Sequence, residues 1–263
     1  MTRMVLQGSP EALNRVPRVT VDFWLIKLMA VTMGETAADY LAVNMGLGLT
    51  VTSLIMTAVL IAALILQFAQ KRYVPWTYWT AVVLISVVGT LVTDNLTDNF
   101  GVPLEATTFA FTIALAVTFA VWRAKEGTLS IHSISTGRRE TFYWLAILFT
   151  FALGTAVGDL ISEVFGFGYV TTGLLFAAII GAITFAYYVL KMDVILSFWL
   201  AYIFTRPLGA SLGDYLSQPM EYGGVGLGTI YTSLLFLAVI ALIVAYMTVN
   251  YEPETATNAE GRM

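Results

Sequence analysis

The sequence has no cysteine, a single histidine and few charged residues. Of its 263 residues, 11% are charged and 58% are hydrophobic. Because a soluble domain carries roughly a quarter charged residues, this composition predicts a membrane protein. The lack of cysteine excludes a disulfide framework and thiolate metal ligands. The histidine, His132, lies in a polar stretch and is interpreted as a solvated loop residue.

Long apolar segments follow one another along the chain. A membrane-spanning helix needs about 20 mostly apolar residues. Eight segments are long enough: 21–43, 48–70, 76–97, 104–123, 141–163, 168–190, 194–217 and 226–249. The fold class is therefore predicted to be an all-α polytopic membrane protein with eight transmembrane helices.

One pattern recurs four times and predicts internal repeats. Each copy begins with an aromatic residue and tryptophan, places glycine 10 positions after the tryptophan, and places aspartate 5 positions after that glycine. The tryptophans are Trp24, Trp79, Trp144 and Trp199, so the steps between them are 55, 65 and 55 residues. Each copy is predicted to be a helical hairpin with a glycine-containing turn. The hairpins are 21–70, 76–123, 141–190 and 194–249.

The longer middle step suggests how the chain is organised. Two halves, 21–123 and 141–249, are predicted on either side of a linker at 124–140, with polar tails at 1–20 and 250–263. Two-helix repeats all enter the membrane from the same side, so they are expected to be parallel repeats rather than inverted ones.

Basic residues predict the orientation in the membrane. They lie in the N-terminal tail and in the links between hairpins, whereas the turns within hairpins contain no lysine or arginine. By the positive-inside rule, both termini and the links are expected to be cytoplasmic. The basic residues of the tail and links are Arg3, Arg15, Arg18, Lys71, Arg72, Arg123, Lys125, Arg138, Arg139 and Lys191.

Acidic residues line one face of the odd-numbered segments. Residues four apart share a helix face, and seven of the 17 acidic residues fall on the face of the repeated aspartate. A charge in the bilayer core costs at least ~2.5 kcal/mol, so these faces should converge on the bundle interior. The seven residues are Glu35, Asp39, Asp94, Asp98, Asp159, Glu163 and Asp214.

The repeated tryptophans indicate how deep the aspartates lie in the membrane, and the repeated glycines indicate how closely the helices pack. If the tryptophans are interface anchors, the aspartates lie about 22 Å away, in the outer part of the membrane. Small residues spaced four apart, such as Gly154 and Gly158, allow close helix packing that would bring the aspartates together. Pro207, inside a predicted helix, is expected to kink it and free a carbonyl.

The candidate site is a carboxylate cluster that binds a cation. The predicted metal ligands are Asp39, Asp94, Asp159, Asp214 and Glu35. Asp98 and Glu163 are candidate second ligands or proton carriers, and Thr90 and Thr155 occupy the repeat position of Glu35 and offer hydroxyl oxygens. Lys27 and Arg206 are candidate gating or charge-balancing residues. Lys27 is expected to extend to the interface, whereas for Arg206 pairing with a carboxylate and snorkelling stay open.

The types of ligand available limit which ions the predicted site could bind. Oxygen ligands without cysteine or membrane histidine favour hard cations such as manganese, magnesium or calcium over copper or zinc. Protons alone also fit, because neighbouring carboxylates disfavour each other's charged form. No resident cofactor and no nucleic-acid partner are predicted. The expected partners are the lipid bilayer, a metal cation and protons, and a homodimer is a candidate assembly.

At these motifs the chain resembles a bacterial family of uncharacterised membrane-anchored proteins built from a repeat of unknown function. The resemblance rests on residues 33–40, 153–160 and 208–215. It implies a bacterial inner (plasma) membrane location but no mechanism.

By analogy with small cation exporters, the function is predicted to be proton-coupled export of a hard cation such as manganese. The alternative is a non-transporting membrane scaffold or regulatory protein with a structural polar core. An enzyme is not expected, because no nucleophile–base pair, HExxH motif or phosphate loop appears in the apolar segments.

Overall fold

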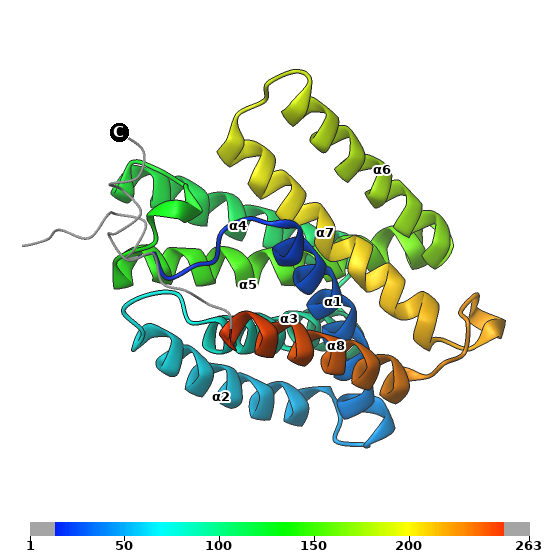
Figure 1. The fold of residues 1–263 in the computed structure, drawn as a ribbon. Helices are drawn as coiled ribbons and strands as arrows, with labels where there is room; N and C mark the ends of the chain where they lie inside the picture. Colours follow the sequence, from blue (N-terminus) through cyan, green and yellow to red (C-terminus); the bar gives the residue numbers. More distant parts are fainter. Residues whose placement is uncertain (1–13, 250–263) are drawn as a thin grey trace, which may run out of the picture.

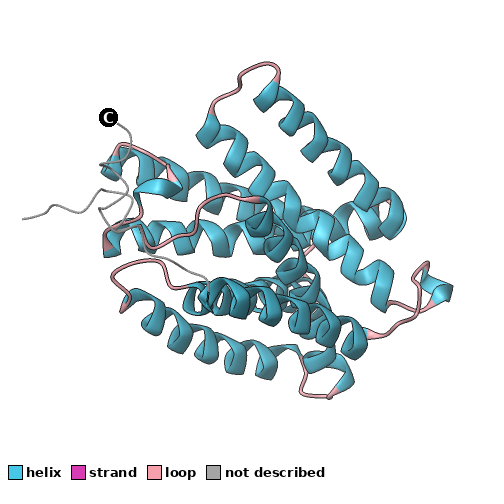
Figure 2. Ribbon diagram, in the orientation of Figure 1, coloured by secondary structure: helices cyan, strands magenta, loops and turns pink. Residues whose placement is uncertain are grey.

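The computed structural model describes residues 14–249, and every regular element in that range is helical (Figure 2). The prediction of an all-α fold is therefore confirmed. Eight α-helices carry the architecture: α1 (Val21–Asp39), α2 (Leu49–Phe68), α3 (Pro75–Asp94), α4 (Leu104–Glu126), α5 (Gly137–Asp159), α6 (Gly168–Tyr188), α7 (Val194–Ser217) and α8 (Thr229–Val249). Three short π-helical and two 3₁₀ segments join them: η2 (Tyr40–Asn44), η3 (Asn95–Asn99), η4 (Ile131–Ser133), η5 (Leu160–Val164) and η6 (Met220–Tyr222).

Seven of these helices are long and apolar enough to cross a membrane. The eighth, α1, carries four charged residues within its 19 residues. These are Asp22, Lys27, Glu35 and Asp39. Two of these charged residues, Lys27 and Glu35, are buried inside the protein.

The odd-numbered helices form the centre of the molecule. α1 packs against α3 and α7, and α5 packs against the same two helices, so the four close a ring. The even-numbered helices lie outside it, and each packs mainly against the inner helix of the next repeat. Thus α2 lies on α3, α4 on α5, α6 on α7, and α8 on α1. In Figure 1 the links after α2 and α4 lie at the left, and the turns after η2 and α7 lie at the right.

Four aromatic pairs tie each repeat to the next at the link end of the ring. The aromatic residue before each tryptophan contacts the tryptophan of the following repeat, and the fourth contacts that of the first. The pairs are Phe23–Trp79, Tyr78–Trp144, Tyr143–Trp199 and Phe198–Trp24, with ring centroids 5.6, 5.5, 6.3 and 5.8 Å apart.

For three of the four tryptophans, this packing corrects the expectation that they are interface anchors. Trp79, Trp144 and Trp199 are 1%, 4% and 4% exposed, which places them in the protein core. Edge-to-face and tilted aromatic pairs stabilise such a core beyond the area they bury. The tryptophans therefore hold neighbouring repeats together.

The four repeated glycines form a second set of contacts between repeats. At each one, a Cβ atom would overlap a side chain of the next repeat, so only glycine allows this approach. The facing pairs are Gly34–Ser86, Gly89–Phe151, Gly154–Arg206 and Gly209–Val31. Ser86, Phe151, Arg206 and Val31 share one repeat position, 7 residues after each tryptophan.

Candidate functional site

The four repeated aspartates sit where the inner helices end. Asp39, Asp94 and Asp159 are the last residues of α1, α3 and α5, and Asp214 lies near the end of α7. Asp214 is 9% exposed and the other three are half-buried. Beyond them, toward the turns, Asp98 and Glu163 are exposed. The inner ring therefore carries one aspartate from each helix at its turn end.

A π-helical segment begins directly after three of these aspartates. η2, η3 and η5 follow Asp39, Asp94 and Asp159, whereas α7 continues as α-helix past Asp214 to Ser217. Single π-turns inside α-helices are rare and occur frequently at functional sites. No pattern in the sequence predicts these segments, and they give the backbone at the aspartate level an unusual conformation in three of the four repeats.

The aspartates are close enough to influence one another electrostatically. Asp94 and Asp214 both experience the charges of Glu35, Asp159 and Asp39. No hydrogen bond or ion pair joins the four aspartate side chains to another residue of 14–249. In the same range, no group of three or more acidic or histidine side chains is arranged to hold a metal ion. The inner ring thus brings four carboxyl groups to one level, without a preformed metal site among residues 14–249.

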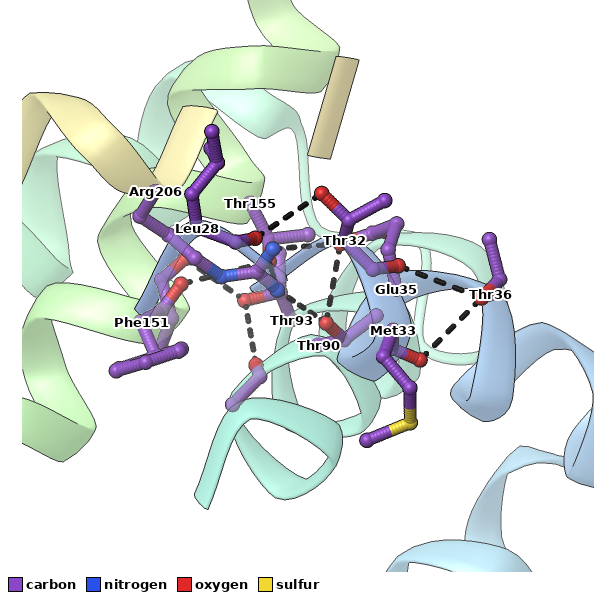
Figure 3. A network of polar contacts seen from close by, with 12 residues as sticks. Leu28, Thr32, Met33, Glu35, Thr36, Thr90, Thr93, Phe151, Thr155 and Arg206 are labelled. Atoms are coloured by element: carbon purple, nitrogen blue, oxygen red, sulfur yellow. Dashed lines mark hydrogen bonds and ion pairs between the residues drawn. The ribbon is translucent and has the colours of Figure 1, made fainter. Parts of the chain in front are cut away.

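One helical turn deeper, Glu35 and Arg206 form a buried ion pair (Figure 3). Arg206 Nη1 lies 2.8 Å from Glu35 Oε2, and the side chains are 0% and 7% exposed. The other guanidinium nitrogen, Nη2, donates to Thr155 Oγ1 at 2.6 Å and to Thr90 Oγ1. Thr90 in turn donates to Glu35 Oε2 at 3.1 Å. All four inner helices therefore meet in one hydrogen-bonded cluster.

The repeat explains how these residues meet. Glu35, Thr90 and Thr155 occupy the same repeat position, and the fourth helix has Ala210 there. Arg206 lies one turn before Ala210, and its long side chain reaches across the ring to the other three. For Arg206, the sequence leaves open pairing with a carboxylate and snorkelling to the interface; in the structure it pairs with the carboxylate of Glu35.

Lys27 differs from its expected position. It was predicted to extend to the interface, but it is 0% exposed. Its Nζ donates to the carbonyl of Tyr202 at 2.7 Å and lies 3.9 Å from the centre of that residue's ring. The reason is that α1 belongs to the inner ring, so Lys27 has protein on all sides. Arg206 is its charged neighbour.

A second polar cluster, at the link end, was missed by the sequence analysis. Glu140 is 0% exposed and accepts from Arg15 Nη1 at 2.6 Å and from Gln67 Nε2 at 3.0 Å. The backbone N–H of Arg15 also donates to Ile134 O at 2.9 Å. Arg15 had been assigned to a polar tail. The available signal was Glu140 itself, an acidic residue beside two arginines at the start of a predicted helix.

These features define a helical membrane protein built from four repeats around a polar centre. A family model described as "Repeat of Unknown Function (DUF347)" matches residues 23–73, 77–128, 142–193 and 197–250. The chain belongs to this family, which confirms the predicted four-repeat family. No curated protein and no solved structure gives a significant match to it.

Proposed function

We propose that this protein is an integral membrane transporter that exports a hard cation such as manganese in exchange for protons. The observation that carries the proposal is the aspartate ring formed by Asp39, Asp94, Asp159 and Asp214. It draws one carboxylate from each inner helix and makes no ion pair with residues 14–249. Such uncompensated intramembrane acidic residues usually mark an ion path.

The proposed membrane arrangement has eight spans, with α1 as the eighth. Its two buried charges face the other inner helices: Lys27 and Glu35 are 0% and 5% exposed, so α1 need not present them to lipid. The cyclic order of the glycine and aromatic contacts supports four parallel repeats about an axis near the membrane normal. Both termini and the links would then be cytoplasmic, in the bacterial inner membrane.

The layers along this axis suggest how the path is closed. The link end is filled by buried aromatic rings, and the Glu35–Arg206 pair lies between them and the aspartate ring. Exposed Asp98 and Glu163 lie beyond the ring at the turn end. In this proposal the structure is open to cations from the turn side, and Arg206 closes the ring toward the link side with its own positive charge.

The aspartate carboxylates are proposed to close around the cation when it enters. Hard divalent cations take six or more oxygen ligands at 2.0–2.6 Å, depending on the ion. Glu35, Thr90 and Thr155 become available as further ligands only if Arg206 moves away, because its guanidinium bonds all three. Cation binding and displacement of Arg206 are therefore proposed to be linked.

The test is cation flux through single aspartate-to-asparagine variants, which keep side-chain size and remove charge. In proteoliposomes, D39N, D94N, D159N and D214N are expected to lower manganese-driven proton movement. Asp193→Asn, at the exposed start of α7, is the matched control and should transport like the natural protein. Unchanged flux in all four ring variants would show that the aspartates are structural.

A second candidate function is that of a non-transporting membrane protein with a structural polar core. The observation that favours it is the Glu35 cluster, in which the carboxylate already has Arg206 and Thr90 as partners. Under this alternative, variants of the aspartate ring would change stability without any cation dependence.

A further inference from the structure

Lys27 is a buried base without an acidic partner. Its Nζ has one hydrogen-bond acceptor, the Tyr202 carbonyl at 2.7 Å, although an ammonium carries three donors. The rings of Tyr202 and Phe151 lie 3.9 and 5.9 Å from it. Every ion pair found in residues 14–249 involves an arginine, so no described carboxylate neutralises Lys27.

The environment of Lys27 favours an amine that exchanges its proton. Burying an unpaired charge is costly, and the neighbouring guanidinium of Arg206 adds a like charge. Arginine stays charged in proteins, whereas a buried lysine readily becomes neutral. Of the ionisable groups on α8, which also packs on α1, Tyr231 and Tyr246 are 74% and 69% exposed, so they do not lie against Lys27.

Three buried tyrosines, Tyr202, Tyr78 and Tyr143, lie at the level of Lys27 or nearer the link end. The Tyr202 hydroxyl is buried without a hydrogen bond to the described residues, and Tyr202 interacts electrostatically with Tyr78 and Tyr143. Those two hydroxyls lie 2.5 Å apart. Tyr143 also experiences the charge of Glu140, in the cluster at the link end.

On the other side of Lys27, the Nε atom of Arg206 is also buried without a partner among the described residues. Buried polar groups of this kind are normally satisfied by ordered water. The same holds for Ser86 Oγ, which occupies the repeat position of Arg206 in α3. The ring axis therefore offers water-binding groups on the turn side of Lys27 and hydroxyls on its link side.

We propose that Lys27 is the proton-carrying residue of the transporter, and that Tyr202, Tyr78 and Tyr143 connect it to the link side. The neutral amine takes one proton from water on the Arg206 side and becomes an ammonium. It then gives one proton to water at the Tyr202 hydroxyl, which bonds neither Lys27 nor Tyr78 nor Tyr143 directly, and this water passes a proton on to the bonded Tyr78–Tyr143 pair. Each hydroxyl accepts one hydrogen and releases another, so no tyrosine becomes ionised. The proposal rests on the proposed function, to which it adds the proton route.

The ionisation state of Lys27 is testable without transport. The chain has four lysines, Lys27, Lys71, Lys125 and Lys191. ¹⁵N NMR of the side-chain nitrogens in the purified protein, at neutral pH, should show one signal in the neutral-amine range. That signal should vanish in Lys27→Met and persist in Lys71→Met, which changes an exposed lysine. Four ammonium signals at neutral pH would overturn the proposal.

The route itself is tested by Tyr202→Phe, which removes only the hydroxyl and keeps the ring over Lys27. Manganese-driven proton movement in proteoliposomes should fall on the order of 100-fold, the scale of a lost proton-transfer group. Manganese binding to the same protein in detergent should stay unchanged. Tyr188→Phe, at a 67% exposed position, is the control for the loss of a hydroxyl.

The two proposals fail differently. If the natural protein binds no manganese and moves no protons, the proposed function is wrong, while the Lys27 signal still shows whether this residue exchanges its proton at neutral pH. If the natural protein couples manganese to protons and both Lys27→Met and Tyr202→Phe couple equally well, the proton route is wrong and the proposed function stands.

Discussion

Removal of the carboxylate of Glu35 is expected to destabilise the protein strongly. Arg206 is 0% exposed, and Glu35 is the only acidic residue with which it pairs in residues 14–249. In Glu35→Gln, the guanidinium would keep the threonine hydroxyls of Thr90 and Thr155 but lose its counter-charge. Breaking a buried pair from one side costs about 3–5 kcal/mol, because the remaining charge is left uncompensated.

The double variant makes this prediction specific. Replacing both partners of a buried ion pair by uncharged residues leaves no uncompensated charge in the core, which is the main cost of breaking the pair from one side. Glu35→Gln combined with Arg206→Gln should therefore be more stable than Glu35→Gln alone, with a coupling of up to ~3 kcal/mol. Unfolding of the natural protein, the two single variants and the double variant in detergent measures the coupling. Additive effects of the two substitutions would refute the pairing argument.

Two further changes test other contacts of the fold. Gly209→Ala places a Cβ against Val31, and this overpacking should lower stability by about 1–3 kcal/mol. Gly181→Ala has no atom near the added Cβ and should stabilise α6 by about 0.5–1 kcal/mol. The unfolding temperatures of the two variants should therefore shift in opposite directions, and equal shifts would contradict the packing at Gly209. Arg15→Ala leaves the carboxylate of Glu140 buried, with Gln67 and Trp144 as its donors. Thermal unfolding should show that the free energy of unfolding falls by a few kcal/mol. Unchanged stability would mean that the Arg15–Glu140 pair does not hold the segment that precedes α1.

The repeat period explains why much of the architecture was predictable. Glycine at a fixed distance from each tryptophan indicated equivalent helices that approach closely, and Gly154 facing Arg206 is such a contact. The partner of each outer helix was not predictable. These helices are mostly apolar, and hydroxyls such as that of Ser53, which bonds Leu91 of α3, do not by themselves indicate which neighbour a helix covers.

The sequence allowed us to predict which polar side chains lie at the same depth along the inner helices, but not which of them bond to one another. Stepping by four along the helices placed Glu35, Thr90 and Thr155 at equal depth, which the structure confirms through their common contact with Arg206. Helix periodicity does not show how far a long side chain reaches, so the pairing of Arg206 across 171 residues stayed open. Lys27 was misassigned because its short distance from Trp24 suggested the interface, whereas three of the four tryptophans lie in the core.

Manganese binding to the aspartate ring can be observed in a crystal. Anomalous scattering from crystals soaked in manganese locates the bound ion. We expect a manganese peak among the carboxylates of Asp39, Asp94, Asp159 and Asp214, with Arg206 displaced from Glu35. Manganese bound only outside the inner ring, or an unchanged ring at saturating manganese, would contradict this expectation.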